Sequence, residues 1–245
     1  WAKNGGWEWF IKAFNDKNFI DALKNTIILN LLDLVIGTPM PILMALLLNE
    51  LAFPKFKRVA QTVLYLPHFL SWVIISSLSL RLLATNDGLV NQIFGTNIAF
   101  LGTENNWRAT YIVLGIWKEC GWNTIIYLAA LTGISPELYE AAAIDGAGIW
   151  QRIIHIMIPA IKKLAGTLLI LQIISVFQIM YEPMVLTKGG PDNASLSLMQ
   201  LMWQYAFGGS MNYGKASAVA VIVTLILLVM TAIYSYFDRK ESDWD

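Results

Sequence analysis

Long apolar segments alternate with shorter polar ones along this chain. Five apolar segments cover residues 22–48, 59–83, 107–131, 164–186 and 216–237. A membrane helix needs about 20 apolar residues to cross the ~30 Å hydrocarbon layer. The pattern therefore predicts an all-α, polytopic transmembrane helix bundle.

The polar segments differ in their content of Lys and Arg, which predicts the orientation. One side carries most of the basic residues: Lys55, Lys57, Arg58, Arg152, Lys162, Lys163, Arg239 and Lys240. Because basic loops stay in the cytoplasm, the segment 134–161 and the tail 238–245 are expected there, and the loop 187–214 outside. Residues 1–21 mix Trp and Phe with Lys, as external interfacial segments do. Five spans with an external N-terminus predict at least one further membrane helix ahead of Trp1.

The segment 134–161 has the signals of a short, exposed helix followed by a turn. Ser135 is a favourable N-cap, Pro136 suits the first helical position, and Glu137 complements the helix dipole. The helix should end at Asp145 and Gly146. We expect Gly146 to adopt a positive φ, or to contact a neighbour too closely for a side chain.

The surface of this short helix looks suited to another protein. Glu140, Ala141 and Ala142 combine a charge with two small side chains, over which a foreign backbone could approach closely. Asp145 adds a second charge that could orient the partner. A second helix should then run through Ile156 and be kinked or restarted by Pro159, since proline cannot continue a regular helix.

These residues also carry a family resemblance. The spacing reads Glu140-Ala141-Ala142, Gly146, Ile156, Ile158, Pro159. This is similar to the coupling loop of the membrane permease subunits of ABC importers, with Ile158 in place of the usual Leu. The stretch 144–147 and the pair Trp150-Gln151 resemble the sugar branch, which includes maltose-type permeases and permeases for polysaccharide fragments. The resemblance extends over nearly the whole chain.

The resemblance implies a fold, a function and a set of partners. The fold would be that of a type I ABC importer permease, and the chain would be a subunit that moves a sugar inward by alternating access. The implied partners are a second permease that is usually a homologue, a solute-binding protein, and a pair of ATPase subunits that hold ATP and Mg²⁺. The implied coupling residues are Glu137, Glu140, Ala141, Ala142, Asp145, Gly146, Ile156 and Pro159. The implied location is a bacterial inner membrane.

Composition excludes several classes of function and of binding site. The apolar fraction is 56% and the formal net charge is zero, so nothing favours nucleic acid as a partner. The single cysteine, Cys120, excludes an intrachain disulfide or a cysteine-based metal site. His68 and His155 lie on different segments and are expected to be core or interface residues. No catalytic set can be assembled, so we expect neither an enzyme nor a cofactor in this chain.

Polar residues inside the apolar segments indicate where cargo could pass, because they normally face the bundle interior or a water-filled cavity. Glu119 and Asn123 lie one turn apart on one span, and Gln172 and Ser175 share a face of the next. We expect Glu119 and Gln172 to face a common cavity. Four further side chains could offer an aromatic face, a hydroxyl or an amide to a sugar ring: Trp122, Tyr127, Gln178 and Tyr181.

Other interpretations of these residues remain open. Each polar side chain could instead form hydrogen bonds between helices, with Glu119 paired to Lys118 of a partner subunit or to Arg81. An ABC permease for amino acids or peptides would share most of the coupling pattern. An ion-coupled secondary transporter would require an inverted repeat with paired broken helices, which the sequence does not show. A structural membrane scaffold would not need the coupling pattern.

Overall fold

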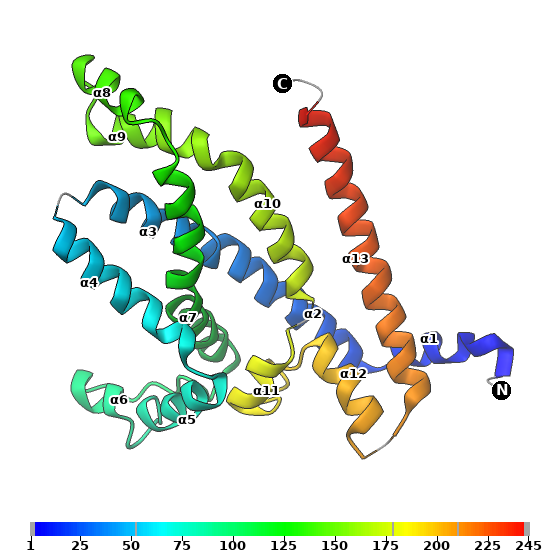
Figure 1. The fold of residues 1–245 in the computed structure, drawn as a ribbon. Helices are drawn as coiled ribbons and strands as arrows, with labels where there is room; N and C mark the ends of the chain where they lie inside the picture. The colour runs from blue at the N-terminus through cyan, green and yellow to red at the C-terminus, as the bar shows by residue number, and fades with distance from the viewer. Residues whose placement is uncertain (1–2, 52, 178, 210, 243–245) are drawn as a thin grey trace. The chain divides into compact units, whose positions relative to one another are not determined.

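The computed structural model describes residues 3–51, 53–177, 179–209 and 211–242. Within these ranges the chain is helical and contains no strand (Figure 1). The longer elements are α1 (Trp7–Phe14), α2 (Lys17–Leu32), α3 (Pro39–Glu50), α4 (Pro54–Tyr65), α5 (Trp72–Leu82), α6 (Leu89–Phe94), α7 (Glu104–Thr132), α8 (Pro136–Ile144), α9 (Ile149–Arg152), α10 (Ile158–Val176), α11 (Tyr181–Thr187), α12 (Leu198–Phe207) and α13 (Tyr213–Ser242).

Three described helical stretches are long and apolar enough to cross a membrane: Lys17–Glu50, Ile149–Ile173 and Tyr213–Ile233. A fourth results if Pro54–Phe69 and Trp72–Leu82 form one broken span. The expected span 59–83 is thus interrupted, because the backbone is extended at Leu70. The expected helix 164–186 is also interrupted, since α10 ends at Val176 and α11 begins at Tyr181.

Helix α7 has the length of the expected third span but a less apolar composition. Its 29 residues include Arg108, Lys118 and Glu119. It is not among the stretches that are long and apolar enough to cross a membrane. A charged side chain in a membrane helix is costly unless it is paired or faces water. Its crossing of the membrane stays a prediction that depends on how these charges are paired.

Two proline sites do not break their helices. A π-helical turn, η2 (Asp33–Gly37), precedes Pro39 and Pro41, and a second, η4 (Ile153–Met157), precedes Pro159. A proline ring clashes with the carbonyl four residues earlier, and the wider π turn, whose bonds join residues five apart, directly precedes both sites. The Thr38 amide donates to the Asp33 carbonyl oxygen at 2.9 Å, which is such a bond. The helical stretches Lys17–Glu50 and Ile149–Ile173 therefore run through these prolines, and the expected restart of the helix at Pro159 does not occur.

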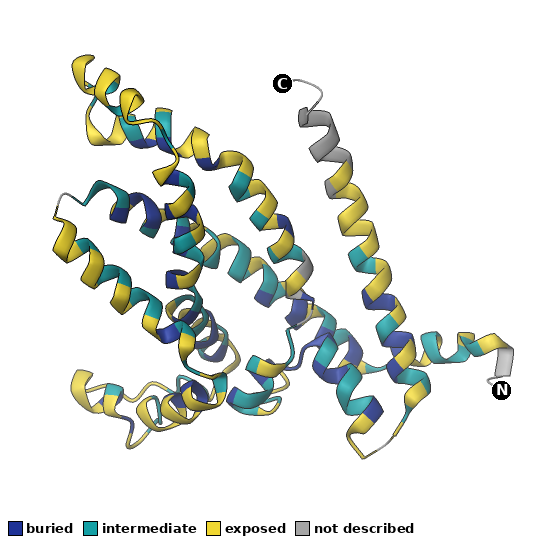
Figure 2. Cartoon of the chain, viewed as in Figure 1, coloured by how far each residue is buried: buried dark blue, intermediate teal, exposed yellow. Residues whose placement is uncertain are grey.

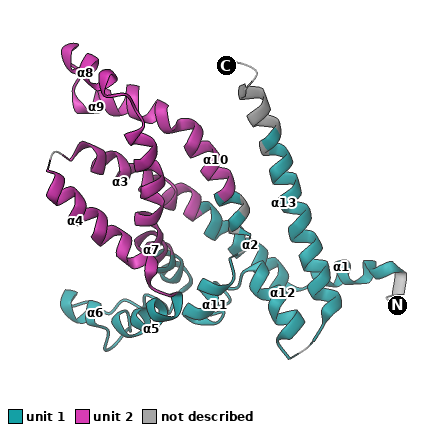
Figure 3. Ribbon diagram, in the orientation of Figure 1, with its two compact units in different colours: residues 1–31, 72–111, 172–245 teal, residues 32–71, 112–171 magenta. Residues whose placement is uncertain are grey.

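Contacts divide the chain into two compact units (Figure 3). Unit 1 comprises residues 1–31, 72–111 and 172–245, and its apolar core includes Phe19, Leu198, Leu201 and Val219. The expected external loop 187–214 is not irregular throughout, because it contains α12, which packs on α13.

One ion pair in unit 1 ties its helices together. The Lys215 Nζ lies 2.8 Å from Asp16 Oδ2, and the Tyr205 hydroxyl donates to the same carboxylate at 2.7 Å. Burial alone would raise the pKa of Asp16, but the bonds from Lys215, Tyr205 and the Asn18 amide lower it below its usual value. The start of α2 is thereby fixed to α12 and α13.

Unit 2 comprises residues 32–71 and 112–171 and holds the coupling segment 134–161. Its core is built from α3, α7 and the η4 turn, with Leu48, Leu131 and Met157 buried in it. Gly121 allows α7 to approach α4, since an added Cβ would lie 1.9 Å from the Leu64 carbonyl oxygen. The two groups of predicted functional residues that unit 2 contains are therefore held on closely packed helices.

Candidate functional site

Helix α8 has the ends that its sequence predicts. It runs over Pro136–Ile144, and the Ser135 hydroxyl accepts a hydrogen bond from the Glu137 amide at 3.3 Å. At the other end Gly146 has a φ of 74°, and the Ala147 amide donates to the Ala142 carbonyl at 2.8 Å. The predicted positive φ of Gly146 is confirmed. The alternative of a close contact is not needed, because nothing in the described chain lies within 4 Å of an added Cβ.

Large apolar side chains are exposed on the surface of α8 and α9. Ile144 is 87% exposed and Trp150 is 72% exposed. Glu137, Glu140 and Asp145 are exposed beside them, and no ion pair is recorded for any of the three in the described ranges (Figure 2). Contiguous apolar residues rimmed by charge mark surfaces that contact another macromolecule.

The residues that follow the turn attach this surface to unit 2. In the η4 turn Ile153 and Met157 are buried, whereas the predicted coupling residue Ile156 is half-buried. Pro159 is exposed in the first turn of α10. Ala141 is exposed and Ala142 is half-buried. The predicted coupling residues therefore lie on one continuous segment, and the structure leaves most of them accessible to a partner.

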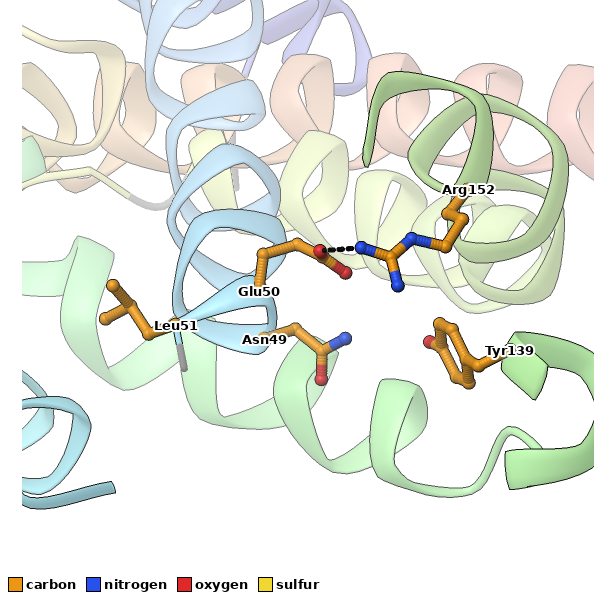
Figure 4. A pocket seen from close by; sticks show the side chains of 5 residues that line it. All are labelled: Asn49, Glu50, Leu51, Tyr139 and Arg152. Atoms are coloured by element: carbon orange, nitrogen blue, oxygen red, sulfur yellow. Dashed lines mark hydrogen bonds and ion pairs between the residues drawn. The ribbon is translucent and has the colours of Figure 1, made fainter. Parts of the chain in front are cut away.

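A cavity of about 370 Å³ lies where this segment meets the end of α3 (Figure 4). It is lined by Asn49, Glu50, Leu51, Tyr139 and Arg152. The Arg152 Nη2 donates to Glu50 Oε2 at 2.8 Å. The sequence did not single out this pair, because 102 residues separate its members.

A second cluster surrounds the predicted path residue Glu119. The Nδ1 of His68 lies 2.8 Å from Glu119 Oε2, and the Lys118 Nζ lies 3.0 Å from Glu119 Oε1. Lys118 also donates to the His68 carbonyl oxygen at 2.8 Å. The indole of Trp122 stacks on the imidazole, with centroids 4.5 Å apart, and Phe69 packs edge-on against the indole. All five residues belong to unit 2.

This cluster revises the expected pairing of Glu119. Among the described residues its partners are Lys118 of the same chain and His68, and no ion pair with Arg81 is recorded; pairing with a partner subunit's lysine stays a prediction. His68, expected as a core or interface histidine, lies partly exposed in the short helix η3 (Leu66–Phe69), which directly follows α4. The available signal was the proline within Leu66–Phe69, which ends α4 and could have marked His68 as a residue at a helix break.

The remaining path residues are less informative. Asn123 and Gln172 are half-buried, and Ser175 is exposed but donates its hydroxyl to the Gln172 carbonyl of its own helix at 2.9 Å. Gln178 lies outside the described residues. Gln172 belongs to unit 1 and Glu119 to unit 2, so a common cavity stays a prediction. No group of three or more potential metal ligands occurs among the described residues.

Comparison with known proteins places this geometry in context. The family model described as "Binding-protein-dependent transport system inner membrane component" matches residues 24–243. A polygalacturonan/rhamnogalacturonan transport system permease protein, YteP of Bacillus subtilis (strain 168), is 41% identical over 93% of this chain and 74% of its own length.

Two solved structures are similar in fold and sequence. One is a bacterial ABC transporter involved in the import of the acidic polysaccharide alginate, with a TM-score of 0.91 and 32% identity over 98% of this chain and 84% of that chain. The other is a bacterial alginate ABC transporter in complex with a periplasmic protein that holds an alginate pentasaccharide. It has a TM-score of 0.88 and 33% identity, over 94% of this chain and 82% of that chain.

Proposed function

Because this chain belongs to the family of inner-membrane components of binding-protein-dependent transport systems, we propose that it is the permease subunit of an ATP-driven oligosaccharide importer. The observation that carries the proposal is α8, a capped nine-residue helix whose acidic and apolar side chains are exposed together. Such a surface is suited to a socket on an ATPase subunit.

In this proposal ATP and Mg²⁺ are held by two ATPase subunits, and neither binds to this chain. Closure of the ATPase pair would push on α8, with Glu137, Glu140, Asp145 and the small residues Ala141 and Ala142 in the socket. The movement would pass through Ile153 and Met157, the buried residues of the η4 turn, into α10 as a rigid-body rotation, which exposes the path to one side and then to the other. The coupling segment is cytoplasmic in this arrangement, and the membrane is a bacterial inner membrane.

A second permease and a solute-binding protein complete the assembly. One coupling segment per chain matches one ATPase subunit, so a second permease, a homologue or a copy, would serve the other. The similar alginate transporter has been solved with its periplasmic binding protein. We propose that the external stretch 187–214, with α12 in its centre, contacts the corresponding protein here.

The cargo that we propose is an oligosaccharide that carries uronate groups. Two relatives transport or are named for acidic polysaccharides or their fragments. The indole of Trp122, 43% exposed, offers a flat apolar face of the kind that sugar rings cover. Lys118 beside Glu119 offsets its charge, so this part of the path does not oppose an anionic cargo. Trp122, Asn123, Gln172, Ser175 and Gln178 are the further path residues of the proposal.

The test is uptake by the whole transporter. The permease would be reconstituted in proteoliposomes with its second permease, its ATPase and its binding protein, and supplied with labelled oligogalacturonate, neutral maltooligosaccharide or amino acids. We expect ATP-dependent uptake of the acidic oligosaccharide. Uptake of amino acids alone would support the permease class for amino acids or peptides. ATP-independent uptake driven by an ion gradient would support a secondary transporter.

A further inference from the structure

We propose that the ion pair between Glu50 and Arg152 is the strut that fixes the coupling segment to the end of α3, so that both move together during transport. Arg152 is the last residue of α9 and Glu50 the last residue of α3. Both side chains are positioning residues, since neither has to touch cargo or nucleotide. This inference rests on the proposed function, because it describes how that function's movement reaches the membrane helices.

The pair is close and largely shielded. The Arg152 Nη2 lies 2.8 Å from Glu50 Oε2, and the two side chains are 26% and 17% exposed. Removing one member of such a pair leaves the other charge partly buried without its partner. Figure 4 shows the two side chains reaching toward each other across the gap between α3 and the coupling segment.

The placement of Glu50 argues against a purely local role. Glu50 stands at the C-terminus of α3, where the helix dipole disfavours a negative charge. Arg152, which comes from outside the helix, offsets this charge at a distance of 2.8 Å. Stability alone would be served as well by a neutral side chain, so the pair indicates a link between the two segments.

The other contacts around the pair are between apolar or neutral polar side chains. Leu48 and Met157 are buried in the shared core, where packing has little directional preference. The adjacent cavity of about 370 Å³ is also lined by Asn49 and Tyr139, which are neutral polar side chains. The ion pair is therefore the strongest directional link that the cavity's lining offers. Directional polar contacts are best suited to fixing one register between packed segments.

The experiment measures uptake per ATP hydrolysed in the reconstituted transporter. Glu50→Gln and Arg152→Gln should each lower this ratio by roughly tenfold, within the range of known couplings between sites. Binding of the ATPase in a pull-down should persist, because α8 keeps its own caps. The charge swap Glu50→Arg with Arg152→Glu should recover most of the loss, and Arg152→Lys should retain most of the ratio.

A matched control is available in unit 1. The Asp16–Lys215 pair has the same 2.8 Å separation and side chains that are 17% and 23% exposed. Lys215→Gln should lower the thermal stability of the complex while uptake per ATP stays at the wild-type value. If Glu50→Gln behaves as this control does, the pair is structural only and the inference fails.

Two further outcomes would also overturn the inference. One is a charge swap that assembles but recovers nothing, and the other is an Arg152→Lys variant as impaired as Arg152→Gln. Failure of the proposed function would look different, since the wild-type complex would then show no ATP-dependent uptake at all.

Discussion

Unit 2 has two acidic regions, one with carboxylates that form no recorded ion pair among the described residues and one with a carboxylate that is paired within the chain. On the coupling segment, Glu140 and Asp145 are exposed, and no ion pair is recorded for either within the described ranges. On α7, Glu119 is held by both Lys118 and His68. The first arrangement leaves its charges for another protein to neutralise. The second neutralises its charge within the chain.

The difference follows from what surrounds each region. A water-exposed carboxylate costs little to leave unpaired, so a docking helix can keep its charges available to a partner. On α7, the predicted span, a carboxylate would be expensive without a counter-charge, and Lys118 supplies one within the chain. A charge that is already balanced can hydrogen-bond to a sugar without imposing a net field on it.

The largest effect should come from reversing a charge in the unpaired region. Glu140→Lys places a cation where we expect the partner to supply one, and like charges held together at an interface cost several kcal/mol. Transport and ATPase stimulation in proteoliposomes should both fall by about a hundredfold or more. Wild-type values for both would remove Glu140 from the coupling role.

The next effect concerns the balanced region. Lys118→Met removes the nearly buried ammonium group beside Glu119 and leaves the carboxylate with His68 alone. Uptake of oligogalacturonate should fall by about tenfold relative to uptake of a neutral oligosaccharide, since about 1.4 kcal/mol of repulsion gives that factor. Equal losses for both cargoes would show that the cluster does not set charge selectivity.

A conformational change in the unpaired region should have a smaller effect. Gly146→Val forces a β-branched residue into a φ of 74°, at a cost of about 1–3 kcal/mol. We expect transport to fall while Gly146→Asn, which tolerates this conformation, stays near wild type. Because no described residue crowds Gly146, an equal loss for Asn would instead indicate close contact with a partner protein.

The smallest effect is expected at Gln172. Gln172→Leu should weaken transport by a few-fold, about the effect of one neutral hydrogen bond, without weakening pull-down of the ATPase. Loss of both together would identify a packing residue. Loss of neither would remove Gln172 from the cargo path.

The coupling segment could be predicted in detail because its determinants are local. Ser135 and Gly146 specify the two ends of α8 through contacts within a few residues of themselves. The apolar segments likewise predicted an all-helical membrane fold. The π turns were missed because the sequence marks Pro39 and Pro159 as obstacles but does not say how the preceding turn adapts.

The Glu119 cluster and the Glu50–Arg152 pair were not predictable in this way. His68 and Glu119 are 51 residues apart, and their meeting depends on how α7 packs against α4 and η3. Gly121 permits that approach, but from the sequence alone a glycine in an apolar helix indicates only a slightly less stable helix. Arg152 could be read as one more orienting charge until the structure placed it against Glu50.

The most direct test of the account is whether α8 touches the ATPase. A Glu140→Cys variant in a Cys120→Ala background would be treated with a short bifunctional thiol reagent in the assembled transporter, beside Trp7→Cys, which is exposed in unit 1. The account predicts a cross-link from position 140 to the ATPase subunit that changes in yield when ATP is bound, and none from position 7. A cross-link from position 7 but not from position 140 would contradict it.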